Sequence, residues 1–276
     1  MKFQYLGTAA AEGWLAIFCA CENCERARKL GWRNIRTRSQ AIIDDKLLID
    51  FPPDTYMHVL QYGLDLSKIE SCLITHNHED HLYPDEFLNR TEGFAHIENK
   101  VPLKIYGTEP TRSKIARYVD LESLTRSGTI SFICISPFVP FNAGGYEIIP
   151  LKANHSAELE PVFFIIGDGE KTVLYAHDTG YFPDETWRYL EEHRPYFNFV
   201  SLDCTLVIKK CRHGHMGIDT ALEVKERLIE LSCADKDTVF CLNHFSHNGD
   251  LIYDELVPVA EKHGFLVSYD GMTLEI

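Results

Sequence analysis

The segment from Thr75 to His81 reads T-H-N-H-E-D-H and follows directly after the apolar run of residues 72–74. Imidazoles and carboxylates are seldom buried without partners, so packing is a poor explanation for this cluster. Because alternate residues leaving a strand point the same way, His76 and His78 can bind one ion. Asp80 and His81 turn toward a second position. The segment therefore predicts two metal ions about 3.5–4 Å apart, a recurrent arrangement in hydrolytic enzymes.

A second group of potential ligands lies near the N-terminus. Cys19, Cys21 and Cys24 form C-x-C-x-x-C in a polar segment that we expect to be a loop at residues 19–24. Three thiols so close together suit a structural metal and lack one ligand for tetrahedral zinc. His247, three residues beyond His244, is a candidate for the fourth ligand. A redox loop or an iron–sulfur ligand set would use the same thiols, and the spacing leaves both open.

Composition bounds the class of protein. The chain has 276 residues, 45% of them hydrophobic and 25% charged, which excludes a disordered, collagenous or coiled-coil protein. The net charge of −14 disfavours nucleic acid and anionic membranes as partners. We find no signal peptide or membrane span, so we expect a cytoplasmic protein. In that reducing compartment the nine cysteines are expected to be thiols and metal ligands.

Short runs rich in Val, Ile, Phe and Tyr predict many strands along the chain. They outnumber the helical patterns and alternate with them irregularly, which favours stacked sheets with helices outside. In the clearest helical pattern Thr220 and Glu223 have capping-box spacing, which predicts that the helix begins there. No repeat or linker divides the chain, so we expect a single domain, 1–276. The predicted helices cover residues 54–61, 110–119, 184–192, 219–231 and 251–262.

The segment ending at His81 resembles the H-x-H-x-D-H signature of the metallo-β-lactamase superfamily. That resemblance implies an α/β fold, an αββα sandwich of two mixed β-sheets flanked by helices. It further implies that His155, Asp178 and His244, each placed after an apolar run, complete a dinuclear site. The ions would be Zn, Mn or Fe. The resemblance assigns His76, His78 and His155 to the first metal, Asp80, His81 and His244 to the second, and Asp178 to both.

The same family pattern singles out two further residues, and the position of His177 beside Asp178 leaves its orientation open. Asp50, which closes an apolar run, matches a position that orients ligands from behind. The resemblance places a general-acid histidine at His215, with His213 as its rival by reach. His177 is adjacent to Asp178, so its side chain either faces away from the metals or lines the pocket.

The cysteine loop narrows the resemblance to a subfamily, the phosphodiesterases of the carbon–phosphorus lyase pathway of phosphonate degradation. There an early Gly-Thr-rich loop, here residues 7–13, precedes C-x-C-x-x-C, and Asp203-Cys204 and residues 270–272 also fit the pattern. The subfamily implies one structural zinc held by Cys19, Cys21, Cys24 and His247. The same cysteine loop occurs in relatives of other roles, including the protein linked to pyrroloquinoline quinone biosynthesis.

These residues predict a dinuclear metal-dependent hydrolase, and the resemblance to the subfamily implies a phosphodiesterase acting on a small cyclic or nucleotide-like phosphodiester. A metal-bridging hydroxide would attack phosphorus, with His215 and Asp80 as catalytic residues. Alternatives are a tRNA-trimming-type nuclease, a lactonase of the same superfamily, and a non-catalytic metal-containing accessory or binding protein. A nuclease would need a basic arm or exosite, and the chain has no long basic insertion. A homodimer is expected because relatives are commonly dimers.

Overall fold

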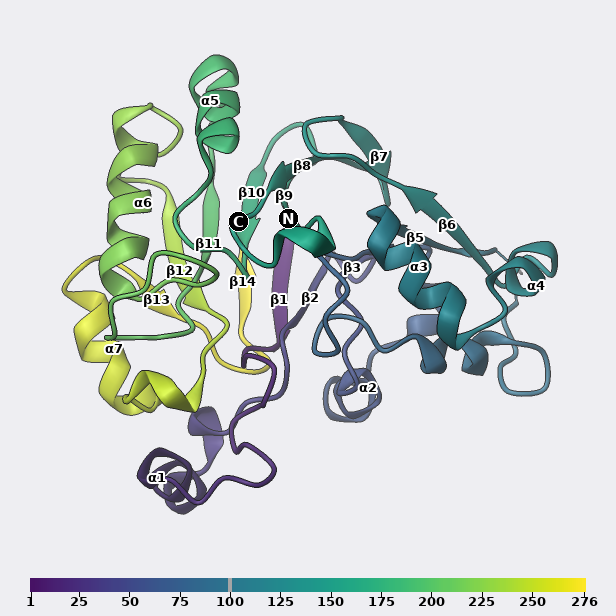
Figure 1. The fold of residues 1–276 in the computed structure, drawn as a ribbon, viewed down its shortest axis with the longest axis horizontal. Helices are drawn as coiled ribbons and strands as arrows, with labels where there is room; N and C mark the ends of the chain where they lie inside the picture. The colour runs from purple at the N-terminus through teal and green to yellow at the C-terminus, as the bar shows by residue number, and fades with distance from the viewer. Residues whose placement is uncertain (99–100) are drawn as a thin grey trace.

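Two seven-stranded mixed β-sheets pack against each other and carry helices on their outer faces (Figure 1). The computed structural model describes residues 1–98 and 101–276. This architecture confirms the αββα sandwich predicted above. In the order of the first sheet, the strands are β14 (Thr273–Glu275), β1 (Lys2–Gly7), β2 (Gln40–Ile43), β3 (Leu47–Ile49), β4 (Ser71–Leu73), β5 (Leu103–Gly107) and β6 (Ile130–Cys134).

The second sheet and the helices complete the layers. In sheet order, its strands are β13 (Leu266–Val267), β12 (Val239–Asn243), β11 (Phe199–Asp203), β10 (Thr172–Ala176), β9 (Val162–Gly167), β8 (Tyr146–Lys152) and β7 (Phe141–Ala143). The α-helices are α1 (Glu22–Leu30), α2 (Thr55–Tyr62), α3 (Glu109–Tyr118), α4 (Leu121–Arg126), α5 (Asp184–His193), α6 (Ile218–Glu230) and α7 (Tyr253–Glu261). Short 3-10 turns are η1 (Trp32–Asn34), η2 (Leu66–Lys68), η3 (Pro84–Arg90), η4 (Ala157–Leu159) and η5 (His247–Gly249).

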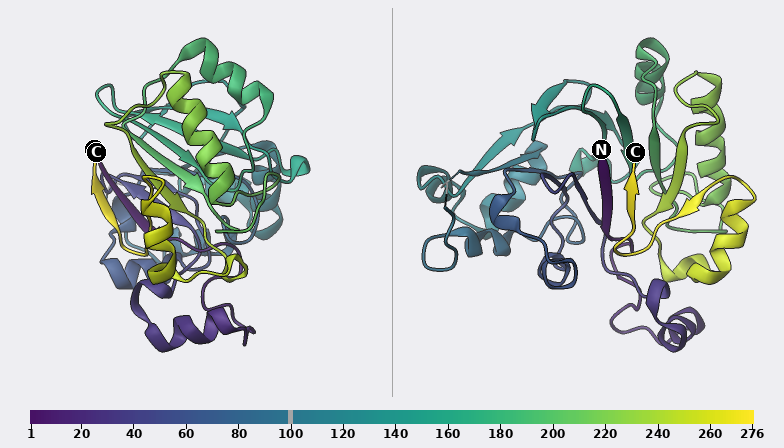
Figure 2. Two further views of the ribbon diagram at one scale, coloured as in Figure 1. Left: turned by 90° about the vertical axis from the view of Figure 1, so that its left-hand side faces the viewer. Right: turned by 180° about the vertical axis from the view of Figure 1, so that it is seen from behind.

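The helices divide between the two sheets. Helices α2, α3 and α4 lie on the side of the first sheet, and α5, α6 and α7 lie on the side of the second (Figure 2). Helix α1 and the cysteine segment form a separate projection at one end of the sandwich (Figure 1). None of the helices in the described part of the chain is long and apolar enough to cross a bilayer.

The core has an inter-sheet layer and two layers beneath the helices. In β9, Phe164 and Ile166 pack in the inter-sheet layer, whereas Phe163 and Ile165 belong to the cluster beneath α5 and α6. Successive residues of a strand face opposite sides, so a strand covered on both faces is apolar throughout. This explains the unbroken apolar run of β9.

The topology gathers strand ends at one edge of the sandwich. Strands β3 to β6 are mutually parallel, and so are β10 to β13. Loops that follow the carboxyl ends of parallel strands meet at the same edge. Asp203 is the last residue of β11, and the segments after β3, β4, β10 and β12 contain Asp50, His76, Asp178 and His244. Regular structure thus positions the residues singled out from the sequence.

The five predicted helices are present as α2, α3, α5, α6 and α7, each within two residues of its predicted ends, whereas α1 and α4 were not predicted. Helix α6 begins at Ile218, and its N-cap Gly217 provides no side-chain cap, so the capping-box prediction was wrong. The Thr220 hydroxyl instead donates to the Cys211 carbonyl oxygen (2.7 Å), and Glu223 pairs with Arg212. Helix α1 begins inside the segment expected as a loop. Only Cys24 and Ala27 of α1 are buried, so its apolar face is short and most of the helix is polar.

Candidate active site

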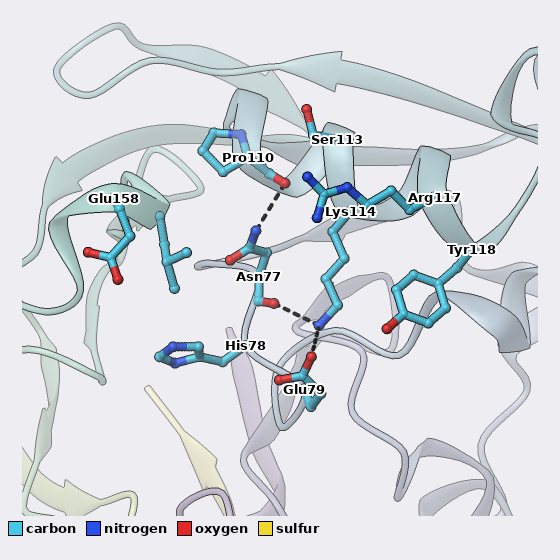
Figure 3. A pocket seen from close by; sticks show the side chains of 10 residues that line it. Asn77, His78, Glu79, Pro110, Ser113, Lys114, Arg117, Tyr118 and Glu158 are labelled. Carbon is cyan, nitrogen blue, oxygen red and sulfur yellow. Dashed lines mark hydrogen bonds and ion pairs between the residues drawn. The ribbon is translucent and has the colours of Figure 1, made fainter.

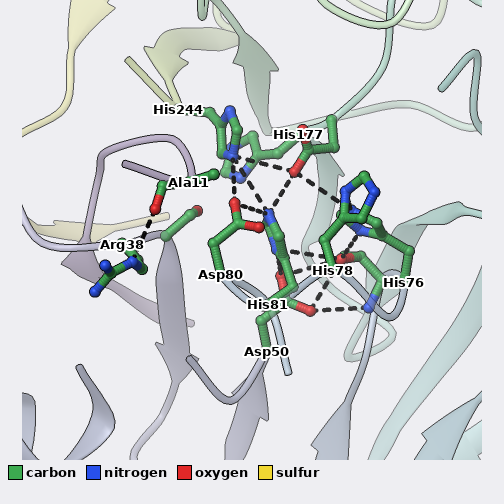
Figure 4. A network of polar contacts seen from close by, with 12 residues as sticks. Ala11, Arg38, Asp50, His76, His78, Asp80, His81, His177 and His244 are labelled. Atoms are coloured by element: carbon green, nitrogen blue, oxygen red, sulfur yellow. Dashed lines mark hydrogen bonds and ion pairs between the residues drawn. The ribbon is translucent and has the colours of Figure 1, made fainter. Parts of the chain in front are cut away.

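The first predicted set of ligands forms a tight cluster of imidazoles. His76 Nε2 lies 2.9 Å from His78 Nδ1 (Figure 4). His155 Nε2 lies 3.2 Å from the same His78 atom. The opposite nitrogen of His155 donates to the Gly214 carbonyl oxygen at 3.0 Å. That hydrogen bond places the proton on Nδ1 and leaves the Nε2 lone pair facing the cluster. The three histidines thus direct nitrogen atoms at one point.

The second set is fully buried and includes two carboxylates. The structure brings Asp80, His81, Asp178 and His244 together with one potential ligand atom from each within 4.8 Å of the others. His81 Nε2 and His244 Nε2 are 3.3 Å apart. Asp178 Oδ2 lies 3.1 Å from His244 Nε2 and in close contact with His81 Nε2.

Asp178 lies between the two sets. Its Oδ1 is 4.0 Å from His155 Nε2 in the first set, and its Oδ2 is 3.9 Å from His76 Nε2 while facing the second set. Asp178 Oδ2 is buried and accepts no hydrogen bond from any residue that the structure describes. A buried anionic oxygen is costly unless a cation balances it, and here either protonated His81 and His244 or a metal ion can do so. Its position fits a carboxylate shared by two metal ions.

The electrostatics of the site favour bound cations. Burial would raise the pKa of Asp178, but the imidazoles of His244 and His81 outweigh it and hold that pKa well below its ordinary value. Burial would lower the pKa of His244, but Asp178 and its acidic neighbours raise it to about 10. Burial lowers the pKa of His76 well below the ordinary value. The site therefore combines ionised carboxylates with a neutral imidazole and attracts positive charge, either a proton or a metal ion.

Two aspartates support these side chains from behind. Asp50 accepts hydrogen bonds from the Thr75 amide (2.8 Å) and from His81 Nδ1 (2.7 Å), which fits its predicted orienting position. Asp203 accepts from the amides of Met216 (2.8 Å) and Asp178 (3.1 Å). Sequence reasoning noted Asp203 only as part of a pattern and gave it no role. Its place at the end of β11 is the signal that could have identified it.

His215, rather than His213, reaches the cluster. Its Nδ1 lies 3.2 Å from Asp203 Oδ2 and 3.4 Å from Asp178 Oδ1, and its side chain is 29% exposed. Burial would lower the pKa of His215, but the Asp203 carboxylate outweighs it and raises that pKa. His213 is exposed, and its ring makes no hydrogen bond within the described ranges. His215 also groups with Asp178, Asp203 and His244 at distances that could hold an ion.

His177 faces away from the ligand clusters. Its Nε2 lies 2.7 Å from Ser201 Oγ, and the Asn243 side-chain amide donates to its Nδ1 at 3.2 Å. The residue is buried in the sandwich beneath the site. Of the two orientations considered from the sequence, the structure therefore shows the one that faces away from the metals.

The cysteine segment meets η5 to form a separate cluster. Cys21 Sγ and Cys19 Sγ lie 3.4 and 3.7 Å from His247 Nδ1, and Cys24 Sγ belongs to the same group. Burial would raise the pKa of the Cys21 thiol, but the Cys24 amide, the Cys19 thiol and His247 lower it to about 6. A thiolate beside two further sulfur atoms and an imidazole is a donor set that suits tetrahedral zinc. The cluster links the N-terminal segment to the loop that carries His244.

Comparisons with known proteins agree with this fold. A sequence model described as "Beta-lactamase superfamily domain" matches residues 46–232. Coenzyme PQQ synthesis protein B from Acinetobacter baumannii (strain ACICU) is 23% identical, and the alignment covers all of both chains. A crystal structure described as a new diphosphatase from the PhnP family has a TM-score of 0.76 at 22% identity and covers 100% of this chain and 97% of its own. Zn²⁺-bound PqqB from Methylobacterium extorquens has a TM-score of 0.75 at 18% identity, with complete coverage of both chains.

Proposed function

Since the chain belongs to the beta-lactamase superfamily, we propose that it is a dinuclear metal-dependent phosphodiesterase acting on a small cyclic or nucleotide-like phosphodiester. The observation that carries the proposal is the position of Asp178, whose carboxylate lies between two sets of ligand atoms. His76, His78 and His155 would hold one divalent ion, Asp80, His81 and His244 the other, and Asp178 both. Zn, Mn or Fe suits these nitrogen and oxygen donors.

When bound, two such ions acidify water and neutralise negative charge that builds on the oxygens of a phosphoryl group. Residues of the chain orient the ligand imidazoles. His155 is fixed by Gly214 and His81 by Asp50, so both present Nε2 to the centre. A fixed tautomer lowers the reorganisation needed when the substrate arrives.

His215 would serve as the general acid for the leaving group. A phosphodiester expels an alkoxide, which needs a proton in the transition state. The Asp203 carboxylate, 3.2 Å from His215 Nδ1, keeps that nitrogen protonated or favours the imidazolium form. The ring is partly exposed at the edge of the site and can therefore meet substrate. Asp80, beside His81 and His244, completes the predicted catalytic pair.

A structural zinc would be held by Cys19, Cys21, Cys24 and His247. His247 follows His244 by three residues, so a metal here would fix the start of η5 and the ligand loop before it. The ion would tie the projection formed by α1 to the sandwich. Its role is to position residues rather than to meet substrate.

Two observations favour a small phosphodiester over other substrates. The similar structure is described as a diphosphatase, and its fold covers this whole chain. A net charge of −14 attracts long nucleic acids weakly, whereas the positive charge of one dinuclear centre would be enough to bind a small anion. Cytoplasmic location and a homodimer stay predictions.

The test is a substrate panel with the Zn-loaded and the Mn-loaded protein. We expect hydrolysis of bis-p-nitrophenyl phosphate and little reaction with a lactone or a precursor tRNA. Preferred cleavage of the lactone or the tRNA would replace the phosphodiesterase proposal with a lactonase or a nuclease. Inactivity on all three would favour an accessory role, the second candidate, which is supported by the full-length similarity to a coenzyme PQQ synthesis protein.

A further inference from the structure

A pocket of about 480 Å³ opens beside the ligand His78. One wall is helix α3, which contributes Lys114, Arg117 and Tyr118, and the opposite wall is η4 with Glu158 (Figure 3). The loop of Asn77, His78 and Glu79 forms the floor of the pocket. The proposed chemistry uses only the end of this space at His78, so the rest of the pocket has no assigned function.

The loop that carries His78 is held to α3 by hydrogen bonds of its neighbours Asn77 and Glu79. Lys114 Nζ donates to the Asn77 carbonyl oxygen at 2.7 Å and to Glu79 Oε1 at 3.1 Å. The Asn77 side-chain amide donates to the Pro110 carbonyl oxygen at 3.0 Å (Figure 3). The ammonium group of Lys114 is therefore already neutralised and committed to the loop. These contacts hold the pocket wall at a fixed place relative to His78.

Arg117 differs from the other cations of this helix. Arg112 pairs with Glu109 and Lys114 pairs with Glu79. Within residues 1–98 and 101–276, the Arg117 guanidinium makes no ion pair and no hydrogen bond, and it lines the pocket together with Lys114 (Figure 3). A guanidinium carries five donors in a planar fork that matches phosphate and carboxylate oxygens. The pocket that His78 lines thus offers one uncommitted cation, Arg117.

We propose that this pocket is a specificity subsite that binds a second anionic group of the substrate through Arg117. The inference rests on the proposed function and narrows it to phosphodiesters that carry an additional oxyanion. Such a substrate would place its scissile phosphate at the metal centre and its second anion along α3. Glu158 faces the same pocket from η4, and its carboxylate opposes an anion that approaches too closely.

The experiment compares matched substrates. The parent compound is thymidine 5′-(p-nitrophenyl phosphate), and its two derivatives carry a 3′-phosphate or a 3′-O-carboxymethyl group, which separates phosphate from carboxylate recognition. We expect the unaltered protein to prefer a 3′-anionic compound over the parent about 10- to 100-fold in kcat/KM, the usual effect of a hydrogen bond to a charged group. Arg117→Gln should bring this ratio close to one.

Arg112→Gln is the matched control, because Arg112 lies on the same helix but does not line the pocket. It should keep the preference of the unaltered protein, and Glu158→Gln should increase that preference. Equal kcat/KM for the three substrates in the unaltered protein, or a preference that survives in Arg117→Gln, would overturn the proposal.

A binding measurement separates this proposal from the proposed function. Calorimetry with thymidine 3′,5′-bisphosphate and thymidine 5′-monophosphate needs no turnover. Tighter binding of the bisphosphate that depends on Arg117 supports the subsite even if no diester is hydrolysed. Equal binding of the two nucleotides rejects the subsite even if bis-p-nitrophenyl phosphate is a substrate.

Discussion

Asp50 Oδ2 lies 2.7 Å from His81 Nδ1, and both side chains are completely buried. The other carboxylate oxygen of Asp50 accepts from the amide and the hydroxyl of Thr75. With one oxygen committed to Thr75, the second must accept the His81 proton. This relationship fixes the tautomer of His81 and directs its Nε2 at Asp178 and His244.

Asp50→Asn should weaken metal binding at the second set of ligands about 10- to 100-fold, the usual cost of losing such a supporting group. The Asn side chain has only one accepting oxygen, so it cannot accept hydrogen bonds from both Thr75 and His81. Its NH₂ group would face the N–H of one of these two residues. Competition with a coloured chelator measures the affinity. Asp45→Asn is the control, since Asp45 is exposed and pairs only with Lys2. Unchanged affinity in Asp50→Asn would show that His81 does not depend on Asp50.

His215→Ala should lower kcat on a phosphodiester about 10²- to 10⁴-fold while the metal content stays unchanged. The reason is that His215 contacts Asp203 at the edge of the site, where the proposal has it donate a proton to the leaving group. Elemental analysis and steady-state kinetics on the same sample measure both effects. His213→Ala, which alters the exposed neighbour, should keep most of the activity. Loss of a metal ion from His215→Ala would identify His215 as a ligand instead.

Cys24→Ser should remove one metal ion, so that a total of about three per chain falls to about two. Cys24 is buried in the cluster with His247, and loss of a structural metal belongs to the large destabilising changes, about 3 kcal/mol or more. Thermal unfolding and elemental analysis measure the two effects. Cys134→Ser is the control, because Cys134 is exposed and does not belong to the cluster with His247. Equal metal content in both variants would contradict the zinc assignment.

His58 gives a pH-dependent term in the free energy of unfolding. The residue is buried between Gln40 and Thr37, and burial lowers its pKa from 6.5 to about 4. As the pH falls below 6.5, the unfolded chain binds a proton that the folded chain accepts only near pH 4. The contribution of neutral His58 to the free energy of unfolding is therefore fully present well above pH 6.5 and is lost as the pH falls toward 4. Between pH 7 and pH 5 the loss is about 2 kcal/mol.

Urea unfolding of the unaltered protein and of His58→Gln at both pH values isolates this term. Burial raises the pKa of Asp270, which contacts Thr37, to about 6, and that shift has the opposite effect on stability. Both proteins retain Asp270 and the metal ligands, so the difference between them reports His58. An equal change in the two proteins from pH 7 to pH 5 would show that His58 does not titrate as described.

The fold class and the convergence of the ligands could be predicted because they depend on a strong local pattern. The three histidines ending at His81 lie within one short segment, and apolar runs precede Asp178 and His244. The structure brings these residues together at the edge where parallel strands end. The family resemblance supplied the pairing of segments that are distant in sequence.

The remaining features depend on tertiary contacts that no local pattern encodes. Thr220 donates to the carbonyl of Cys211 instead of capping α6, so the capping box was wrong although the helix begins within one residue of its predicted start. Asp203 acquires its role from Met216 and His215, which reach it only after the loop folds back. Arg117 resembles any solvated arginine in sequence, and only the pocket beside His78 distinguishes it.

Reconstitution of the metal-free protein with Zn or Mn, followed by bis-p-nitrophenyl phosphate hydrolysis, tests the central claim most directly. We expect hydrolysis to rise until about three ions are bound per chain, two at the His and Asp ligands and one at the cysteines. The chelated protein should be inactive. Binding of a single ion by the His and Asp ligands, or no release of p-nitrophenol from the fully loaded protein, would contradict a dinuclear phosphodiesterase.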